Sequence, residues 1–112
     1  MKIRFYRSSD RDALQSYRLT DLRFTSHPKE AVADLENRYA ILGLEEDQIV
    51  TFLILDAGEK KFTYGGQPES LLLRSFSTDE DFRMRGYGSQ TLKLLPDFIR
   101  EHLPMYKSII LG

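Results

Sequence analysis

The chain contains no cysteine, and this absence excludes several kinds of chemistry at once. A disulfide framework, a zinc site built on thiolates and a cysteine nucleophile all require that residue. Histidine is scarce as well, since only His27 and His102 are present. Neither has a second ligand at the spacing that a metal site requires, so we expect no bound metal.

Long apolar runs and an excess of positive charge are also lacking. No stretch approaches the ~20 apolar residues of a membrane helix, and the start, Met1–Phe5, lacks the apolar stretch and cleavage site of a signal peptide. The sequence therefore predicts a cytoplasmic protein without membrane contact. Sixteen lysines and arginines against seventeen acids give a net charge of −1, so no basic field is present to attract nucleic acid.

The composition is otherwise that of an ordinary globular protein. The chain has 112 residues, of which 41% are hydrophobic and 29% are charged. A chain of this length forms one domain and buries roughly 65% of the surface that its unfolded form exposes. We therefore expect residues 1–112 to fold as a single domain.

The first third of the chain predicts one strand and two helices. Lys2–Arg7 alternates apolar and polar residues, which is typical of a half-buried strand. Ser8–Asp10 favours the start of a helix. The apolar residues that follow fall on one helical face: Ala13, Leu14, Tyr17 and Leu22. His27–Pro28 opens a second helix, because proline is preorganised for a first turn, and Glu36 and Asn37 close it.

The middle of the chain predicts an antiparallel hairpin. Tyr39–Leu44 and Ile49–Leu55 are apolar runs rich in strand-forming residues, and a short charged turn separates them. Ala57–Glu69 is a polar loop in which Lys61–Tyr64 is a candidate short strand.

The last third predicts a β-α-β unit. Leu71–Ser77 and Ser108–Leu111 are its strands, and Tyr87–Leu103 is the helix between them. Such a unit places its strands side by side and parallel, with a right-handed crossover. The fold class is therefore α/β with a mixed sheet.

The clearest chemical signal is Arg83-x-x-Gly86-x-Gly88, between a strand and a helix. Glycines let the backbone approach a ligand closely, and the unpaired amides and dipole of a helix start attract anions. With Arg83 and Arg85, these features predict a phosphate or pyrophosphate site. A tight turn with solvated arginines is the alternative, because short glycine motifs are weakly specific.

Two other nucleotide-binding motifs do not match this segment. A dinucleotide fingerprint requires a third glycine, where this chain has Thr91, and a Walker loop requires a following Gly-Lys-Ser/Thr.

The segment resembles the acetyl-CoA motif of the GNAT family of N-acetyltransferases, Q/R-x-x-G-x-G/A, which opens a helix after the fourth strand. Arg83–Gly88 matches every position, and Asp81-Phe82 resembles the acidic and aromatic pair that commonly precedes the motif. The predicted order of strand, two helices, three strands, helix and strand is also the family order. The resemblance covers the whole chain in topology and Leu71–Leu95 in specific residues.

This resemblance implies the fold of acyl-CoA N-acyltransferases and a set of binding residues. Phe76, Ser77 and Thr78 correspond to the strand end that pairs with the pantetheine arm. The pyrophosphate would be held by Arg83, Met84, Arg85, Gly86, Tyr87, Gly88 and Ser89. The amine substrate would enter beside the first two helices, near Tyr17, Asp21, Phe24 and His27.

The resemblance does not identify the catalytic residues. Glu45 and Glu69 are possible bases by position, although both also fit solvated turns. Family members continue after the fifth strand with a helix, which commonly carries a tyrosine that protonates the thiolate, and two more strands. The sequence ends at Gly112, so we expect a fold that lacks this C-terminal part and is unstable or dimeric through Ser108–Leu111.

The resemblance therefore implies an acetyl-CoA-dependent N-acetyltransferase that uses no metal. Its acceptor would be a small-molecule or peptide amine, which the sequence does not identify. The alternative is a truncated, non-catalytic module of the same fold that binds CoA or a protein partner.

Overall fold

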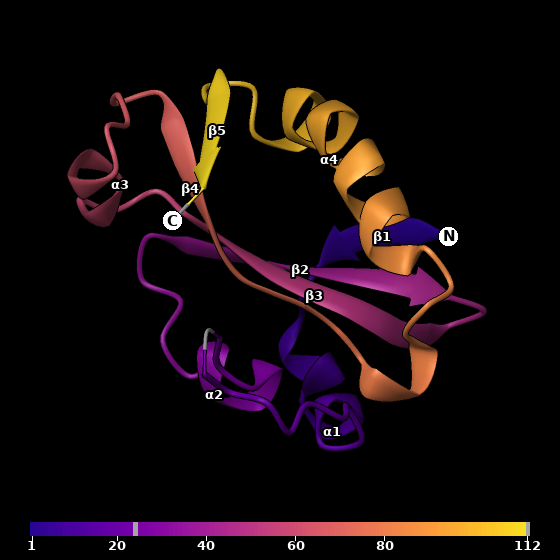
Figure 1. Ribbon diagram of the computed structural model, residues 1–112. Helices are drawn as coiled ribbons and strands as arrows, with labels where there is room; N and C mark the ends of the chain where they lie inside the picture. Colours follow the sequence, from indigo (N-terminus) through magenta and orange to yellow (C-terminus); the bar gives the residue numbers. More distant parts are fainter. Residues whose placement is uncertain (24, 112) are drawn as a thin grey trace.

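The protein is a five-stranded sheet with helices on both faces, as Figure 1 shows for the computed structural model, which describes residues 1–23 and 25–111. The strands are β1 (Lys2–Phe5), β2 (Arg38–Glu45), β3 (Gln48–Asp56), β4 (Ser70–Thr78) and β5 (Ser108–Leu111). The α-helices are α1 (Arg11–Leu14), α2 (Pro28–Ala31), α3 (Lys60–Thr63) and α4 (Tyr87–His102), and two short 3-10 helices are η1 (Ser8–Asp10) and η2 (Glu80–Phe82).

The strands lie in sequence order, β1-β2-β3-β4-β5. Neighbouring strands from β1 to β4 are antiparallel, and β5 pairs with β4 in parallel, with Leu71 opposite Ile109. The α4 helix makes the crossover between these parallel strands. The predicted mixed α/β sheet and its C-terminal β-α-β unit are therefore confirmed.

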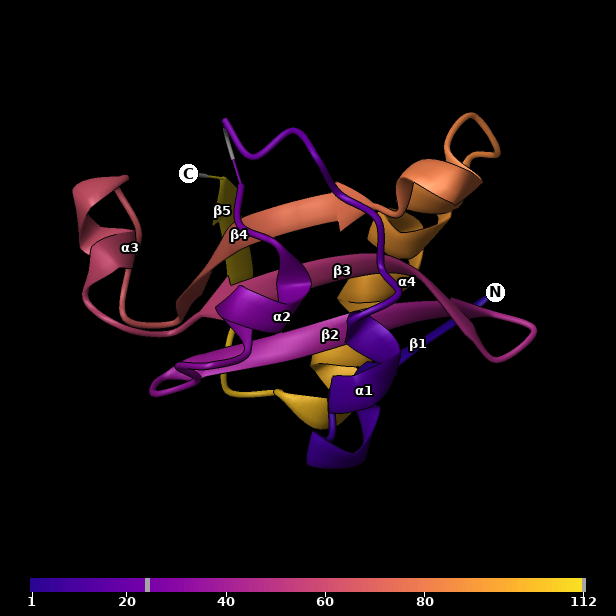
Figure 2. The ribbon, with the colours of Figure 1, turned by 90° about the horizontal axis from the view of Figure 1, so that it is seen from below.

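Both faces of the central strands are buried, which explains why their sequences are continuous apolar runs. Along β3, Leu53 and Leu55 face a core beneath α4, while Phe52 and Ile54 face a second core beneath α1 and α2. Figure 2 shows the second side, with α1 and α2 lying across β2 and β3 and α4 behind the sheet. No described helix is long and apolar enough to cross a bilayer.

The two N-terminal helices are shorter than the sequence predicts. The predicted inward face ends early, because α1 stops at Leu14 and Leu22 is 46% exposed. Residues 18–20 instead use their backbone groups in long-range contacts: the Arg18 amide donates to Asp79, and the Thr20 amide donates to Glu80. Tertiary hydrogen bonds therefore replace the expected helical ones.

The second helix begins as predicted but does not extend to Glu36. His27 caps α2 by accepting a hydrogen bond from the Lys29 amide at its Nδ1, and Pro28 is the first helical residue. The helix ends at Ala31, and turns follow. Val32 and Leu35 still pack against the core, although they lie outside the helix.

The predicted short strand at Lys61–Tyr64 is wrong, because Lys60–Thr63 is the α3 helix. Gly65 adopts a left-handed conformation, with φ of 83°, and the Gly66 amide donates to the Lys61 carbonyl, which together end the helix. The buried Lys61 ammonium donates to the Pro68 carbonyl at 2.7 Å. The alternation of polar and aromatic residues in this segment therefore comes from one helical turn.

A buried pair of hydroxyls fixes the first turns of α4 on the sheet. Thr91 donates to the Tyr87 carbonyl at 2.8 Å, and its oxygen lies 2.7 Å from the Thr51 hydroxyl of β3. Gly43 of β2 makes room for this pair, because a Cβ there would lie 1.9 Å from the Thr51 oxygen. The start of α4 is thereby positioned by a polar contact inside the core.

We expect Thr91→Val to lower the free energy of unfolding by about 1–3 kcal/mol, because the buried Thr51 hydroxyl loses its partner. The double variant Thr51→Val/Thr91→Val should recover part of that loss, since it leaves no unpaired hydroxyl. Urea unfolding of the four proteins in the cycle measures both effects. A double variant as unstable as the sum of the singles would show that the contact is not specific.

Candidate functional site

The loop from η2 to α4 brings the glycine motif to the start of a long helix. Met84 and Gly86 both have left-handed backbones, with φ of 66° and 78°, and Gly86 is the residue that caps α4. The first four amides of a helix have no intrahelical acceptor, so those of Tyr87, Gly88 and Ser89 are free of helical hydrogen bonds. The dipole of α4 adds positive potential at the same place.

Two arginines flank these amides. The Arg83 guanidinium is exposed and lies 3.8 Å from Glu80, a distance at which the ion pair is loose. Arg85 stacks over the Phe82 ring at 5.4 Å. Both charges therefore remain accessible to an anion at the helix start.

The same helix turn lies directly against the end of β4. A Cβ on Gly88 would lie 3.4 Å from the Thr78 hydroxyl and 3.5 Å from the Phe76 ring. The structure thus places the predicted strand residues next to the predicted loop residues.

Strand β4 contains a β-bulge that the sequence analysis missed. Phe52 pairs with Ser77 and Ile54 with Arg74, so Ser75 and Phe76 together face the single residue between their partners. Ser75 has φ of 54°, which is uncommon for a residue other than glycine. A bulge leaves backbone groups outside the ladder, so β4 offers hydrogen-bonding groups at this point.

A cavity opens where β4 extends past the described part of β5. The pairing ends with Leu73 opposite Leu111, while β4 continues to Thr78. The cavity has a volume of about 600 Å³. It is lined by Leu22, Arg23, Thr25, Ser26, Tyr64, Leu72, Leu73, Arg74, Ser75, Phe76 and Leu111. The bulge and the segment between α1 and α2 therefore share one cavity.

Of the described residues predicted on the substrate side, Tyr17 is the one with a hydrogen bond to β4. Its buried hydroxyl lies 2.8 Å from the Ser77 hydroxyl. Burial raises the pKa of the Tyr17 phenol, and the hydrogen bond with Ser77 only partly opposes this shift. Tyr17 is therefore a neutral hydrogen-bonding group at neutral pH.

The other predicted substrate-side residues are placed differently. The His27 Nε2 lies 2.7 Å from the Tyr17 carbonyl, so His27 contacts the backbone of Tyr17. Asp21 is exposed and forms a two-pronged ion pair with Arg23, and it does not line the cavity. Phe24 lies outside the described residues.

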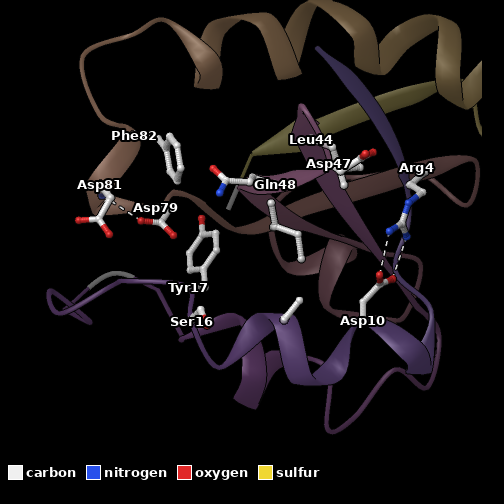
Figure 3. Close-up of a pocket in the computed structure, with 12 residues that line it drawn as sticks. Arg4, Asp10, Ser16, Tyr17, Leu44, Asp47, Gln48, Asp79, Asp81 and Phe82 are labelled. Carbon is white, nitrogen blue, oxygen red and sulfur yellow. Dashed lines mark hydrogen bonds and ion pairs between the residues drawn. The ribbon is translucent and has the colours of Figure 1, made fainter.

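A second cavity, of about 420 Å³, lies between α1 and the β2–β3 turn, on the other side of Tyr17 (Figure 3). The Arg4 guanidinium and the Asp10 carboxylate form two hydrogen bonds of 2.8 Å at one end, and hydrogen bonding to Arg4 lowers the pKa of Asp10. At the other end the Tyr17 hydroxyl points toward Asp79, and Phe82 lies beyond Asp79. Tyr17 lines this cavity and not the one beside the bulge, which Ser75 and Phe76 line.

The two acids considered as bases do not line the cavity beside the bulge. Glu45 lies at the end of β2, 3.2 Å from the N-terminal ammonium, and Glu69 is exposed before β4. Among residues 1–23 and 25–111, no group of three or more histidines and carboxylates could hold a metal ion.

Comparison with known proteins identifies the family. No family model matches the chain. A Bacillus subtilis protein named uncharacterized N-acetyltransferase YbbJ is 35% identical over 118 aligned positions, which cover 100% of this chain and 74% of the relative. The chain belongs to the GNAT family of N-acetyltransferases.

Solved structures show the same fold at low sequence identity. A GNAT family acetyltransferase from Staphylococcus aureus superposes with a TM-score of 0.71 and 19% identity, over 99% of this chain and 84% of that one. AAC(6')-Iy, in complex with the bisubstrate analogue CoA-S-monomethyl-acetylneamine, gives 0.69 and 13%, over 99% and 78%. The sheet and its crossover helix are therefore those of GNAT acetyltransferases.

The contact between residues 18–20 and η2 should depend on pH. Hydrogen bonds from the Thr20 amide and hydroxyl, both 2.7 Å, lower the pKa of Glu80. A carboxylate with a lowered folded pKa stabilises the fold above its unfolded value of about 4.3, and this stabilisation disappears as the pH falls through the folded value. We expect the urea midpoint of Glu80→Gln to lie below that of the wild type at pH 7.

The gap between the two midpoints should close between about pH 5 and pH 3. Asp97→Asn is the control, because Asp97 is exposed on α4 and its one ion pair among the described residues is with Arg100 on the same helix. A gap for Glu80→Gln that stays constant over this range would show that the Glu80 charge does not hold the contact.

Proposed function

We propose that the protein transfers the acetyl group of acetyl-CoA to the nitrogen of an amine. The observation that carries the proposal is the meeting of three features along β4: the glycine loop at the start of α4, the bulge at Ser75 and the cavity beside it. Two findings support the proposal: the chain belongs to the GNAT family, and the structurally similar AAC(6')-Iy binds an analogue that contains CoA.

The residues present fit the chemistry of acetyl-CoA. The amides of Tyr87, Gly88 and Ser89 would bind the pyrophosphate, and Arg83 and Arg85 would add charge. The pantetheine arm would follow Phe76–Thr78 from there, because this part of β4 extends past the described end of β5. The thioester would then reach the bulge.

The reaction would be a direct transfer. The lone pair of a neutral amine attacks the thioester carbonyl carbon, the new C–N bond forms, and the C–S bond breaks. The nitrogen loses one proton and the CoA thiolate gains one. The protein would contribute positioning of the two reactants and a backbone amide at Ser75 or Phe76 that polarises the carbonyl.

A non-catalytic CoA-binding role is the second candidate. It is favoured by the absence of any carboxylate or imidazole among the described residues lining the cavity. Two measurements separate the candidates: calorimetry with acetyl-CoA tests binding, and thiol release in the presence of an amine panel tests transfer. Binding without thiol release for any amine would favour the second candidate.

The glycine loop generates a test of the binding site itself. We expect Gly88→Val to weaken acetyl-CoA binding by at least about tenfold, because its methyl groups would occupy the space between α4 and Thr78. Gly86→Val should have a similar effect by forcing a β-branched residue into a left-handed backbone. Arg83→Ala should weaken binding less, about threefold, because the amides would remain.

Gly65→Val is the matched control, since Gly65 also has a left-handed backbone but ends α3 with no atom within 4 Å of its Cβ. It should lose stability and retain acetyl-CoA affinity in calorimetry. Unchanged affinity in both loop variants would place the binding site elsewhere.

A further inference from the structure

The charges around the cavity beside the bulge carry an inference about the acceptor, which rests on the proposed function. We propose that the acceptor is an α-amino acid with an apolar side chain, whose carboxylate is bound by Arg74. None of the described residues that line this cavity is an aspartate or a glutamate, whereas Arg23 and Arg74 both line it. The cavity therefore presents positive charge and no negative charge.

Arg23 adds little to this charge, because Asp21 pairs with it through hydrogen bonds of 3.0 and 2.9 Å. The situation of Arg74 is different. Its Nη1 donates to the Asp56 carboxylate at 3.2 Å, and the same oxygen accepts from Arg38 at 3.3 Å. Two guanidinium groups share one buried carboxylate, so this cluster has a net charge of +1.

The geometry of the cluster leaves Arg74 able to bind a ligand. A guanidinium has five N–H groups in a planar fork that matches a carboxylate, and the described contacts of Arg74 use its Nη1 alone. Its side chain is 35% exposed, close to the 33% of Arg38, whereas that of Asp56 is 5% exposed. Of the two arginines, Arg74 is the one that lines the large cavity, so it presents the positive charge of the cluster there.

Negative charge lies immediately beyond Arg74. A smaller cavity, of about 160 Å³, shares Ser26, Arg74 and Ser75 with the larger one and adds the carboxylates of Glu30 and Asp34. An ammonium and a carboxylate on the same carbon atom fit this arrangement, with the carboxylate at Arg74 and the amine beside the bulge. A polyamine has no carboxylate for Arg74 and would instead place an additional ammonium group there.

The rest of the large cavity is lined by a mixture of hydroxyl and apolar side chains. Among the apolar ones, Leu22 and Tyr64 are 46% and 48% exposed, and Leu72 and Leu73 are buried. Exposed apolar side chains around one cavity are typical of a binding site for apolar groups. An aliphatic or aromatic side chain on the amino acid would contact them.

The test compares the acetylation of leucine, leucinamide, isoamylamine and spermidine by the wild-type chain. Leucinamide is the decisive comparison, because its amine is less basic than that of leucine. A larger fraction of it is therefore neutral near pH 7, and it should react faster than leucine if the protein does not recognise the carboxylate. We expect kcat/KM for leucine to exceed that for each of the others by at least about tenfold. Leucinamide, isoamylamine or spermidine acetylated as fast as leucine would overturn the inference and leave the proposed function intact.

Arg74→Gln should reduce the preference for leucine over leucinamide to about twofold or less, mainly by raising KM for leucine, while acetyl-CoA affinity changes little. Asp56 keeps Arg38 as a partner in this variant, so the fold should persist. Arg100→Gln, on the exposed side of α4, is the matched control and should retain the preference. A preference that survives in Arg74→Gln would overturn the inference.

Acetyl-CoA binding distinguishes a failure of this inference from a failure of the proposed function. A chain that binds acetyl-CoA and acetylates no amino acid contradicts the inference alone. A chain that does not bind acetyl-CoA contradicts the proposed function, and the inference fails with it.

Discussion

The structure depends on an asymmetry in how β4 is held. On one side, an antiparallel ladder with β3 extends from Leu72 to Thr78, whereas on the other side the pairing with β5 covers only Ser70–Leu73. Among the described residues, no strand pairs with the β5-side edge of Arg74–Thr78, which we call the free half of β4. In the proposed site an extended ligand would use the backbone groups of this edge as a neighbouring strand does. The loop, the bulge and the cavity are all arranged along this free half of β4.

The segment between α1 and α2 is held in position by hydrogen bonds to the same strand and to the residues that follow it. It has little apolar periodicity and forms no long helix, but its backbone and Tyr17 bond to residues just after or within the free half of β4. The two parts of the proposed site are thus joined by a hydrogen bond between the Tyr17 and Ser77 hydroxyls and by backbone amides that donate to the Asp79 and Glu80 carboxylates. A substitution in η2 can therefore change the acceptor side without contacting either reactant.

The sequence predicts the central strands and the long helix well, because their signals are local. Ile49–Leu55 has to be a strand to bury both of its faces, and the glycine motif identifies the start of α4. The short helices were predicted poorly, since residues 18–20 exchange helical hydrogen bonds for contacts with Asp79 and Glu80 that lie about 60 positions away. No local pattern encodes such partners.

The bulge left a signal that could have been read. Leu73 and Phe76 pack against the same core, although residues three apart on a regular strand face opposite sides. An apolar spacing of three within a strand therefore indicates one extra residue. The ion pairs of Arg74 had no such signal, because Arg74 shares the Asp56 carboxylate with Arg38, which lies on a strand that is not next to β4.

The cap of α2 also has a consequence for the position of Tyr17. The Nδ1 of His27 accepts from the Lys29 amide, so its Nε2 carries the hydrogen that points to the Tyr17 carbonyl. One imidazole ring thus joins the first turn of α2 to the backbone of the residue whose hydroxyl contacts Ser77. Replacing His27 would therefore loosen two distant parts of the chain at once, the start of a helix and the side chain that reaches β4.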